Sequence, residues 1–249
     1  MHPLRRAAAI AARRLDRPEL LAAVYPPARQ AQLEEVGIKA LLAGVLHEGA
    51  TYIDVGTNRG QVLGEAVRVA PRAHHIAFEP IPALAAEVRR AFPTVDCRRL
   101  ALGARREVTE FCHFRKLDGW SGLRRNSQIS DEQGDPELIE VQVSTLDEEL
   151  AEVEPTVLKI DVEGAELEVL RGGRELLARA RPLIVFEHVA AAAAGYGEAP
   201  GAPWQLLHEL GYEVFAMSGE GPFDQARFAA GTEIVNWLAR PAAAAEPPG

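Results

Sequence analysis

Short apolar segments alternate with helical patterns along most of the chain. Three of these segments, at residues 51–55, 156–162 and 183–188, are near-continuous apolar runs, which is typical of strands buried on both faces, and a further short strand is expected at residues 75–78. Strands separated by helices of this length form right-handed βαβ units, so the strands lie parallel and helices cover both faces of the sheet. This pattern places the chain in the α/β class.

The remaining elements fit the same plan. We expect further strands at residues 97–102, 107–114, 138–146, 212–217 and 233–238, and helices at residues 3–24, 28–47, 61–69, 82–91, 165–178 and 203–210. Residues 1–48 then form an N-terminal helical extension, and residues 49–240 form one domain, which suits a chain of 249 residues. A polar insertion at about residues 112–137 interrupts this domain. The residues 241–249, rich in proline and alanine, are expected to be disordered.

Composition narrows the function classes. The net charge of −9 argues against a protein that binds nucleic acid by neutralising phosphates. The longest apolar runs fall far short of the ~20 residues of a membrane-spanning helix, so we expect no membrane partner and a cytoplasmic location. The two cysteines, Cys97 and Cys112, are too few for a disulfide framework. The sequence leaves the oligomeric state open, a homo-oligomer included.

A glycine-containing turn follows the first strand of the predicted domain. Gly56 and Gly60 flank Asn58, which stands where a dinucleotide-binding turn has its middle glycine. Asp54 ends the strand below this turn, and its carboxylate would repel a pyrophosphate and attract an ammonium or sulfonium group. The turn therefore favours S-adenosylmethionine over NAD as the ligand. The alternative is a tight turn in which Asp54 only caps the following helix.

Glu79 ends the second strand and precedes Pro80. An acidic residue at this position can accept hydrogen bonds from both hydroxyls of a ribose. The alternative is that Glu79 caps the helix that begins near Pro82. Together with Asp54, Glu79 indicates an adenosyl pocket.

Charged residues also occupy the strand at 156–162. Lys159 and Asp161 point to the same face of this strand, and a lysine in a buried strand needs a carboxylate partner. The two residues therefore either form a structural pair or place Asp161 at a substrate site. Glu163 and Glu166 are expected to stabilise the N-terminus of the next helix.

Glu187 and His188 end the next strand. Neighbouring residues on a strand point to opposite faces, so at most one of the two side chains faces the site directly. Histidine is the side chain best suited to taking up a proton near neutral pH. His188 is therefore either a catalytic base or ligand, or a hydrogen-bonded surface residue.

Four segments of the chain resemble the FkbM-type methyltransferases: residues 54–60, 78–80, 159–166 and 169–172. The resemblance covers roughly residues 50–240 and departs from the family at Thr57, where alanine is commoner. It implies the class I methyltransferase fold, a Rossmann-like α/β fold with a seven-stranded, mostly parallel sheet, helices on both faces and an antiparallel final strand. It also implies S-adenosylmethionine as methyl donor and a hydroxyl of a sugar, polyketide or other small metabolite as acceptor.

The resemblance assigns roles to residues of this chain. It implies that Asp54, Gly56, Asn58 and Gly60 hold the methionine part of the donor, that Glu79 binds the ribose, and that Ala101 and Leu102 flank the adenine. Two routes can remove the hydroxyl proton of the acceptor. In one, His188, or else His113, is the general base. In the other, Asp161, Glu187 and His188 hold a divalent metal, Mg²⁺ or Mn²⁺, as metal-dependent O-methyltransferases do with residues at these strand ends.

The insertion at 112–137 is assigned to the acceptor, because a long irregular segment in a compact domain tends to be a lid or binding loop. His113, Asp118, Trp120 and Arg124 offer an apolar face and polar groups that suit a sugar ring, and Tyr196 is a candidate for a second wall. The alternative is a surface loop with no binding role.

These observations predict an O-methyltransferase that acts on a small molecule, a sugar or glycoside before a polyketide or other secondary metabolite. Two hypotheses from other functional classes remain. One is a nicotinamide-dependent oxidoreductase, against which Asp54 argues. The other is a non-catalytic protein that binds an adenosyl group.

Overall fold

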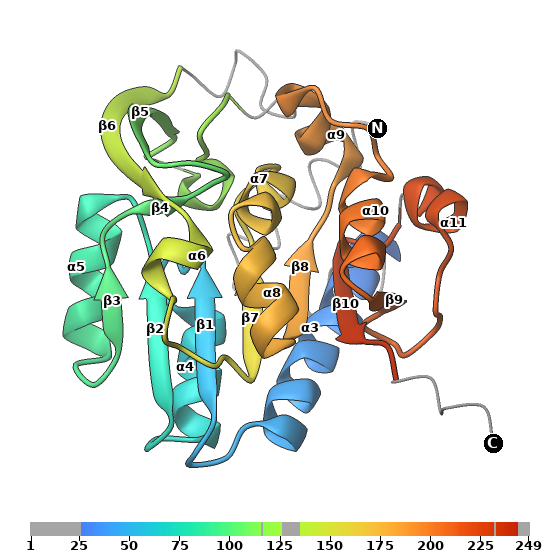
Figure 1. Cartoon of the computed structure of the whole chain (residues 1–249). Coiled ribbons are helices and arrows are strands. Elements are labelled where there is room, and N and C mark those ends of the chain that lie inside the picture. Colours follow the sequence, from blue (N-terminus) through green and yellow to red (C-terminus); the bar gives the residue numbers. More distant parts are fainter. Residues whose placement is uncertain (1–25, 116, 126–134, 232, 244–249) are drawn as a thin grey trace.

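The computed structural model describes residues 26–115, 117–125, 135–231 and 233–243 (Figure 1). The helix expected at 3–24 and most of the tail expected at 241–249 lie outside these described residues. Among the described residues, no helix combines the length and the apolar character needed to cross a membrane.

A seven-stranded sheet forms the centre of the molecule. Its strands lie in the order β3 (Asp96–Arg98), β2 (His74–Phe78), β1 (Thr51–Val55), β7 (Val157–Ile160), β8 (Leu183–Glu187), β10 (Asn236–Pro241), β9 (Tyr212–Ala216). The pairs β1–β2, β1–β7, β7–β8 and β2–β3 are parallel, whereas β10 runs antiparallel to both β8 and β9. This confirms the predicted fold class, including the antiparallel final strand.

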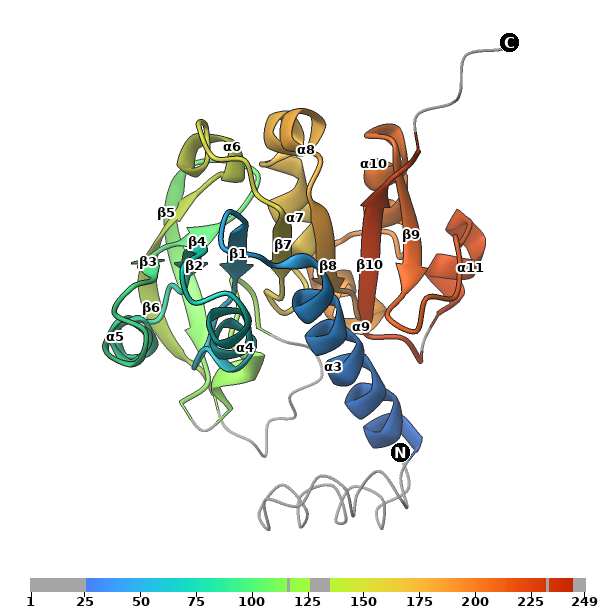
Figure 2. The ribbon, with the colours of Figure 1, turned by 90° about the horizontal axis from the view of Figure 1, so that it is seen from below.

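Helices cover both faces of this sheet (Figure 2). One face carries α3 (Pro26–Val45), α4 (Gln61–Val69) and α5 (Pro82–Ala91), and the other carries α7 (Glu166–Arg171), α8 (Arg174–Ala180) and α10 (Ala202–Glu209). Each layer buries its own apolar cluster against the strands. The shorter helices are α6 (Leu146–Glu149), α9 (Ala190–Ala193), α11 (Gln225–Ala230) and the 3₁₀ turns η1 (Asp118–Trp120) and η3 (Ala194–Tyr196).

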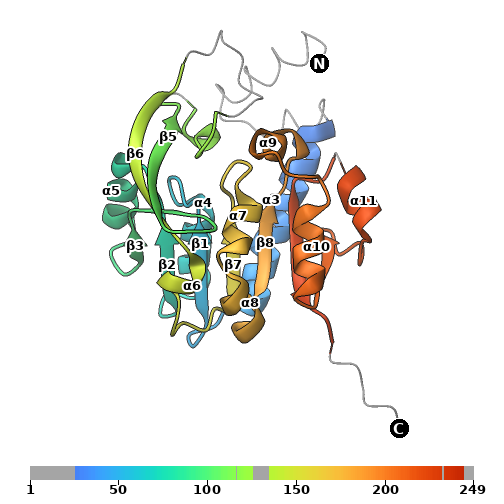
Figure 3. The same ribbon diagram turned by 45° about the horizontal axis from the view of Figure 1, so that its top comes forward.

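A second, three-stranded sheet carries the predicted insertion. It consists of β4 (Ala101–Leu102), β6 (Glu137–Ser144) and β5 (Glu107–His113) in that order, with β5 and β6 antiparallel. This sheet stands above the carboxyl ends of β1 and β2 (Figures 1 and 3). The insertion therefore leaves β5 and returns to β6 beside the sheet edge at which α/β proteins bind ligands.

Two elements that were predicted as continuous are each divided in two in the structure. The strand expected at 97–102 divides, because β3 belongs to the large sheet and β4 to the small one. The helix expected at 165–178 breaks into α7 and α8 at Gly172 and Gly173. A Cβ atom on Gly172 would lie 2.0 Å from the carbonyl oxygen of Gly103, so the backbone at this break packs directly on the turn after β4.

The helix α3 is anchored to the last strand by a buried carboxylate. Glu34 Oε2 accepts hydrogen bonds from the backbone N–H of Asn236 at 2.9 Å and from its amide at 3.0 Å. Glu34 Oε1 accepts a third bond from the N–H of Val235 at 3.2 Å. The first described helix and the last strand are therefore joined directly.

Candidate functional site

A cavity of about 540 Å³ opens at the carboxyl ends of the strands. This volume is within the usual range for small-molecule sites. Its walls come from the turn after β1, the end of β2, β4, the insertion and the turn between β7 and α7. Its lining residues include Val55, Gly56, Asn58, Glu79, Ile81, Ala101, Leu102, Phe111, Arg115, Asp118, Ser121, Leu123, Asp161 and Glu163. The cavity thus joins the predicted cofactor turn to the predicted insertion.

The turn after β1 has little room for side chains. Gly56 has a φ of +79°, and a Cβ there would lie 1.8 Å from the carbonyl oxygen of Asp161. Gly60, at the start of α4, has a φ of +77° and packs on Phe92, so it supports the turn from behind. Of the four residues predicted here, Gly56 and Asn58 line the cavity.

Glu79 connects this turn to the next strand. Its Oε2 accepts the backbone N–H of Asn58 at 2.8 Å, and its Oε1 accepts that of Ile81 at 2.9 Å. Burial raises the pKa of Glu79 to about 7, and the two backbone donors oppose this shift. Each oxygen still has a free lone pair, so the carboxylate can accept two further hydrogen bonds from a ligand in the cavity.

Asp54 does not carry the role that its sequence position suggested. Its side chain is 1% exposed, and its Oδ1 lies 3.5 Å from Lys159 Nζ, whose other carboxylate neighbour is Asp161 Oδ2 at 3.0 Å. Burial raises the pKa of Asp54, and Lys159 opposes the shift. Asp54 therefore lies inside the sheet beside Lys159 and does not line the cavity, in contrast to the expectation that its carboxylate faces a cationic ligand.

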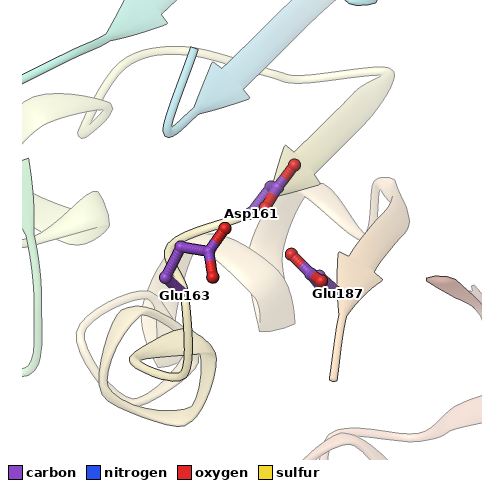
Figure 4. Close-up of side chains that lie close together, drawn as sticks. All are labelled: Asp161, Glu163 and Glu187. Atoms are coloured by element: carbon purple, nitrogen blue, oxygen red, sulfur yellow. The ribbon is translucent and has the colours of Figure 1, made fainter. Parts of the chain in front are cut away.

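Three carboxyl groups converge beside the cavity. One oxygen each of Asp161, Glu163 and Glu187 lies within 4.8 Å of the others, and Figure 4 shows the three side chains turned toward a common centre. Asp161 and Glu163 line the cavity. We refer to these three residues as the acidic cluster.

The pKa values of two members of the acidic cluster shift in opposite directions. Burial and the neighbouring Asp161 raise the pKa of Glu187 well above its usual range. Burial would also raise the pKa of Asp161, but Lys159 lowers it overall. These opposite shifts favour a protonated Glu187 beside an ionised Asp161.

His188 lies away from the acidic cluster. Its ring stacks on Phe228 with the ring centroids 5.1 Å apart. Burial lowers the pKa of His188. Of the two strand-end residues, Glu187 faces the cluster. The predicted grouping of Asp161, Glu187 and His188 is thus corrected: Glu163, which the sequence interpretation assigned to a helix terminus, takes the place of His188.

Asp118 ties the insertion to the turn after β1. Its Oδ2 lies 2.6 Å from Arg59 Nη2, and its Oδ1 lies 3.1 Å from His113 Nε2. Arg59 also pairs with Glu87 at 2.6 Å. Asp118 lines the cavity, and His113 supports it from behind. The indole of Trp120 packs on the apolar cluster of Cys112 and Phe114 instead.

Arg124 and Tyr196 join the insertion to η3. The backbone N–H of Arg124 donates to Tyr196 Oη at 3.2 Å, and its guanidinium donates to the carbonyl oxygen of Gly195 at 3.1 Å. The same guanidinium lies over the Tyr196 ring, 5.2 Å from its centre. These two residues hold the insertion in place. Four further side chains that line the cavity were not predicted: Phe111 of β5, and Arg115, Ser121 and Leu123 of the insertion.

Comparisons with known proteins identify the family. A model of the methyltransferase FkbM domain matches residues 54–214. No match was found among curated proteins. The methyltransferase FkbM from Methylobacillus flagellatus KT is similar, with 14% identity and a TM-score of 0.49 over 79% of this chain, and this chain spans 45% of its length.

A TehB-like SAM-dependent methyltransferase from Corynebacterium glutamicum is also similar, with 13% identity and a TM-score of 0.44 over 82% of this chain and 85% of its own. The family match covers more than half of the chain and includes the turn after β1, Glu79 and the acidic cluster. The chain therefore belongs to the FkbM methyltransferase family and has the class I fold of S-adenosylmethionine-dependent methyltransferases.

Proposed function

We propose that the protein transfers the methyl group of S-adenosylmethionine to a hydroxyl oxygen of a small molecule, a sugar or glycoside. The observation that carries this proposal is that one cavity is lined by Gly56, by Glu79 and by two members of the acidic cluster, Asp161 and Glu163. In this proposal the turn at Gly56 and Asn58 holds the methionine part, Glu79 binds the ribose, and Ala101 and Leu102 flank the adenine.

The acidic cluster suits the chemistry that remains. During transfer the methyl carbon leaves the sulfonium, which becomes a thioether, and bonds to the acceptor oxygen, which must lose its proton. The sulfonium is already activated, so the protein has to align the oxygen, exclude water and accept that proton. Asp161 lines the cavity, so we assign it the role of accepting this proton. His188, stacked on Phe228, is given no catalytic role.

The insertion supports a sugar-like acceptor. Phe111 and Leu123 give the cavity an apolar wall, and Asp118, Ser121 and Arg115 add polar groups. A pyranose has an apolar face and a rim of hydroxyls, which such a mixed wall can bind. A polyketide hydroxyl is the alternative acceptor.

The acidic cluster also fits a divalent ion. Three carboxylate oxygens within 4.8 Å are the hard donor set that Mg²⁺ and Mn²⁺ take, and the cluster contains Glu163 in place of the predicted His188. Such an ion, when bound, would lower the pKa of the acceptor hydroxyl. Asp161 would then serve as a ligand that Lys159 keeps ionised.

Incubation with methyl-labelled donor and a panel of sugars, glycosides and polyketides tests the proposal. We expect label in a sugar or glycoside ether. Asp161→Asn should lower kcat about 10²–10⁴-fold and change the affinity for S-adenosylhomocysteine little. His188→Phe, which keeps the stack on Phe228, should retain turnover.

Other results have distinct meanings. Cofactor binding without transfer to any acceptor would support the hypothesis of a non-catalytic adenosyl-binding protein. Failure to bind S-adenosylhomocysteine in calorimetry would support the hypothesis of a nicotinamide-dependent oxidoreductase. Loss of turnover after chelation, restored by Mg²⁺ or Mn²⁺, would assign an ion to the acidic cluster. Full turnover after exhaustive chelation would assign the proton to the carboxylate alone.

Cofactor affinity should depend on pH through Glu79. With a pKa of about 7, this carboxyl is mostly protonated at pH 6 and mostly ionised at pH 8. Ribose hydroxyls bind better to the ionised form, so the affinity for S-adenosylhomocysteine should rise about tenfold between these values, in proportion to the competent fraction. Calorimetry at both pH values measures this change.

The control for this prediction is Glu79→Gln, which keeps only one of the two acceptor oxygens and cannot ionise, so it should bind more weakly and with a nearly pH-independent affinity. The free energy of unfolding has the opposite pH dependence. The pKa of Glu79 is raised from 4.5, so its contribution to stability is present below pH 4.5 and is lost as the pH rises through 7. A tenfold rise in affinity that persists in Glu79→Gln would contradict the assignment.

A further inference from the structure

The turn between β7 and α7, residues 161–165, has a backbone conformation that its sequence disfavours. Glu163 has a φ of +56°, in the left-handed region that side chains other than glycine rarely adopt. Gly164 follows with a φ of +106°, and a Cβ there would lie 2.8 Å from the backbone of Ala192. Strained residues of this kind persist only where the surroundings impose them, and they concentrate at functional sites.

The side chain of Glu166 accepts two hydrogen bonds from the backbone of this turn. Its Oε1 accepts the backbone N–H of Val162 at 3.1 Å and that of Gly164 at 3.0 Å, the two donors on either side of Glu163. Glu166 is 1% exposed. Burial raises its pKa to about 7, and the backbone donors oppose this shift. Burying a carboxyl group without hydrogen bonds costs free energy. The two backbone donors therefore compensate for the burial of Glu166.

The consequence of the strained turn is the position of Glu163. Its carboxylate lies within 4.8 Å of those of Asp161 and Glu187 and lines the cavity (Figure 4). Local backbone preference would not bring Glu163 to this place, because side chains other than glycine rarely adopt the left-handed region.

From this geometry we propose that Glu166 is a positioning residue for methyl transfer: it holds the 162–164 turn so that the Glu163 carboxylate stands beside Asp161 in the cavity. The proposal rests on the proposed function for the reaction itself. Its competitor is a purely structural role, in which Glu166 only stabilises the start of α7.

A conservative and a disruptive variant separate these roles. In Glu166→Gln the amide oxygen can accept the same two backbone bonds, so kcat should stay within about threefold of the wild type. In Glu166→Ala the bonds are lost, and kcat should fall at least tenfold while the KM for S-adenosylmethionine changes little. A purely structural role predicts a lower Tm for Glu166→Ala and no loss of kcat in either variant well below that Tm, and such a result would overturn the proposal.

A double-mutant cycle tests whether Glu166 acts through Glu163. If it does, the variant that combines Glu163→Gln with Glu166→Ala should be no slower than Glu163→Gln alone. Multiplicative losses in kcat would show that the two residues act independently and would overturn the proposal.

Two measurements decide the proposal without an acceptor. Glu163→Ala and Glu163→Gly remove the same side chain, but only glycine relieves the left-handed strain. The glycine variant should therefore have the higher Tm, by about 2–4 °C, the reverse of the usual order of these two residues. A crystal structure of Glu166→Ala should show Glu163 outside the left-handed region and its carboxylate displaced from Asp161.

An equal or lower Tm for Glu163→Gly, or an unmoved Glu163 in Glu166→Ala, would refute the positioning role. Absence of methyl transfer by the wild type to every acceptor would refute the proposed function, while these two measurements would still decide the role of Glu166.

Discussion

Replacing Gly56 with alanine is expected to destabilise the protein by about 4 kcal/mol or more, which is exceptional for one methyl group. The added Cβ would lie 1.8 Å from the carbonyl oxygen of Asp161, and that backbone cannot rotate away as a flexible side chain would. The turn after β1 and the turn after β7 would have to separate. Because both turns line the cavity, S-adenosylhomocysteine binding should be lost as well. Urea unfolding and calorimetry measure the two effects.

Gly197 provides the matched control. Its φ is +77°, nearly that of Gly56, but a Cβ there meets no atom within 4 Å in the described structure. Gly197→Ala therefore introduces the left-handed strain without the collision and should cost only about 1–2 kcal/mol. Similar losses of stability in the two variants would show that the contact between the two turns is not the reason for glycine at position 56.

Lys159→Met should destabilise the protein by about 3–5 kcal/mol, the usual cost of removing one partner from a buried ion pair. The carboxylates of Asp54 and Asp161 would lose their common cation within the sheet. Burial alone would lower the pKa of Lys159, but these two carboxylates raise it well above its usual value, so the ammonium stays charged. Denaturant titrations at two pH values measure the loss.

The loss should be larger at pH 8 than at pH 5. Without Lys159, burial raises the pKa values of both aspartates above their unfolded values, so the stability of the variant falls as the pH rises through them. Lys39→Met is the control, because Lys39 pairs with Glu35 at 2.6 Å on the surface and such pairs contribute about 0–1 kcal/mol. An equal loss in both lysine variants would contradict the buried pair.

Much of the fold could be predicted because its signal is local and repetitive. The helix at 82–91 was predicted with its observed bounds, since Pro82 begins it and apolar residues recur at helical spacing. The split of 97–102 between two sheets could not be predicted, because strand assignment to a sheet depends on contacts distant in sequence. The same holds for the break at Gly172, where the cause is the distant backbone of Gly103.

The site, too, could be predicted only where the signal is local in the sequence. The pairing of Lys159 with Asp161 follows from alternation along one strand, and it was among the predicted alternatives. That Asp54 shares this lysine depends on the pairing of β1 with β7, in which Asp54 and Lys159 stand in register. The arrival of Glu163 in the acidic cluster depends on a left-handed residue, which no periodicity reveals.

The strand order determines how much chain a self-sufficient fold requires. The family match ends at residue 214, inside β9, whereas β9 reaches the rest of the large sheet through β10, which follows it in sequence. A fragment trimmed to the match would leave the edge of β8 unpaired and open to association with other chains. It would also remove both α3 and the backbone donors that Glu34 binds. The segment that matches the family model is therefore shorter than the unit that folds. The strand β10 and the helix α3, which complete that unit, come from sequence outside the match.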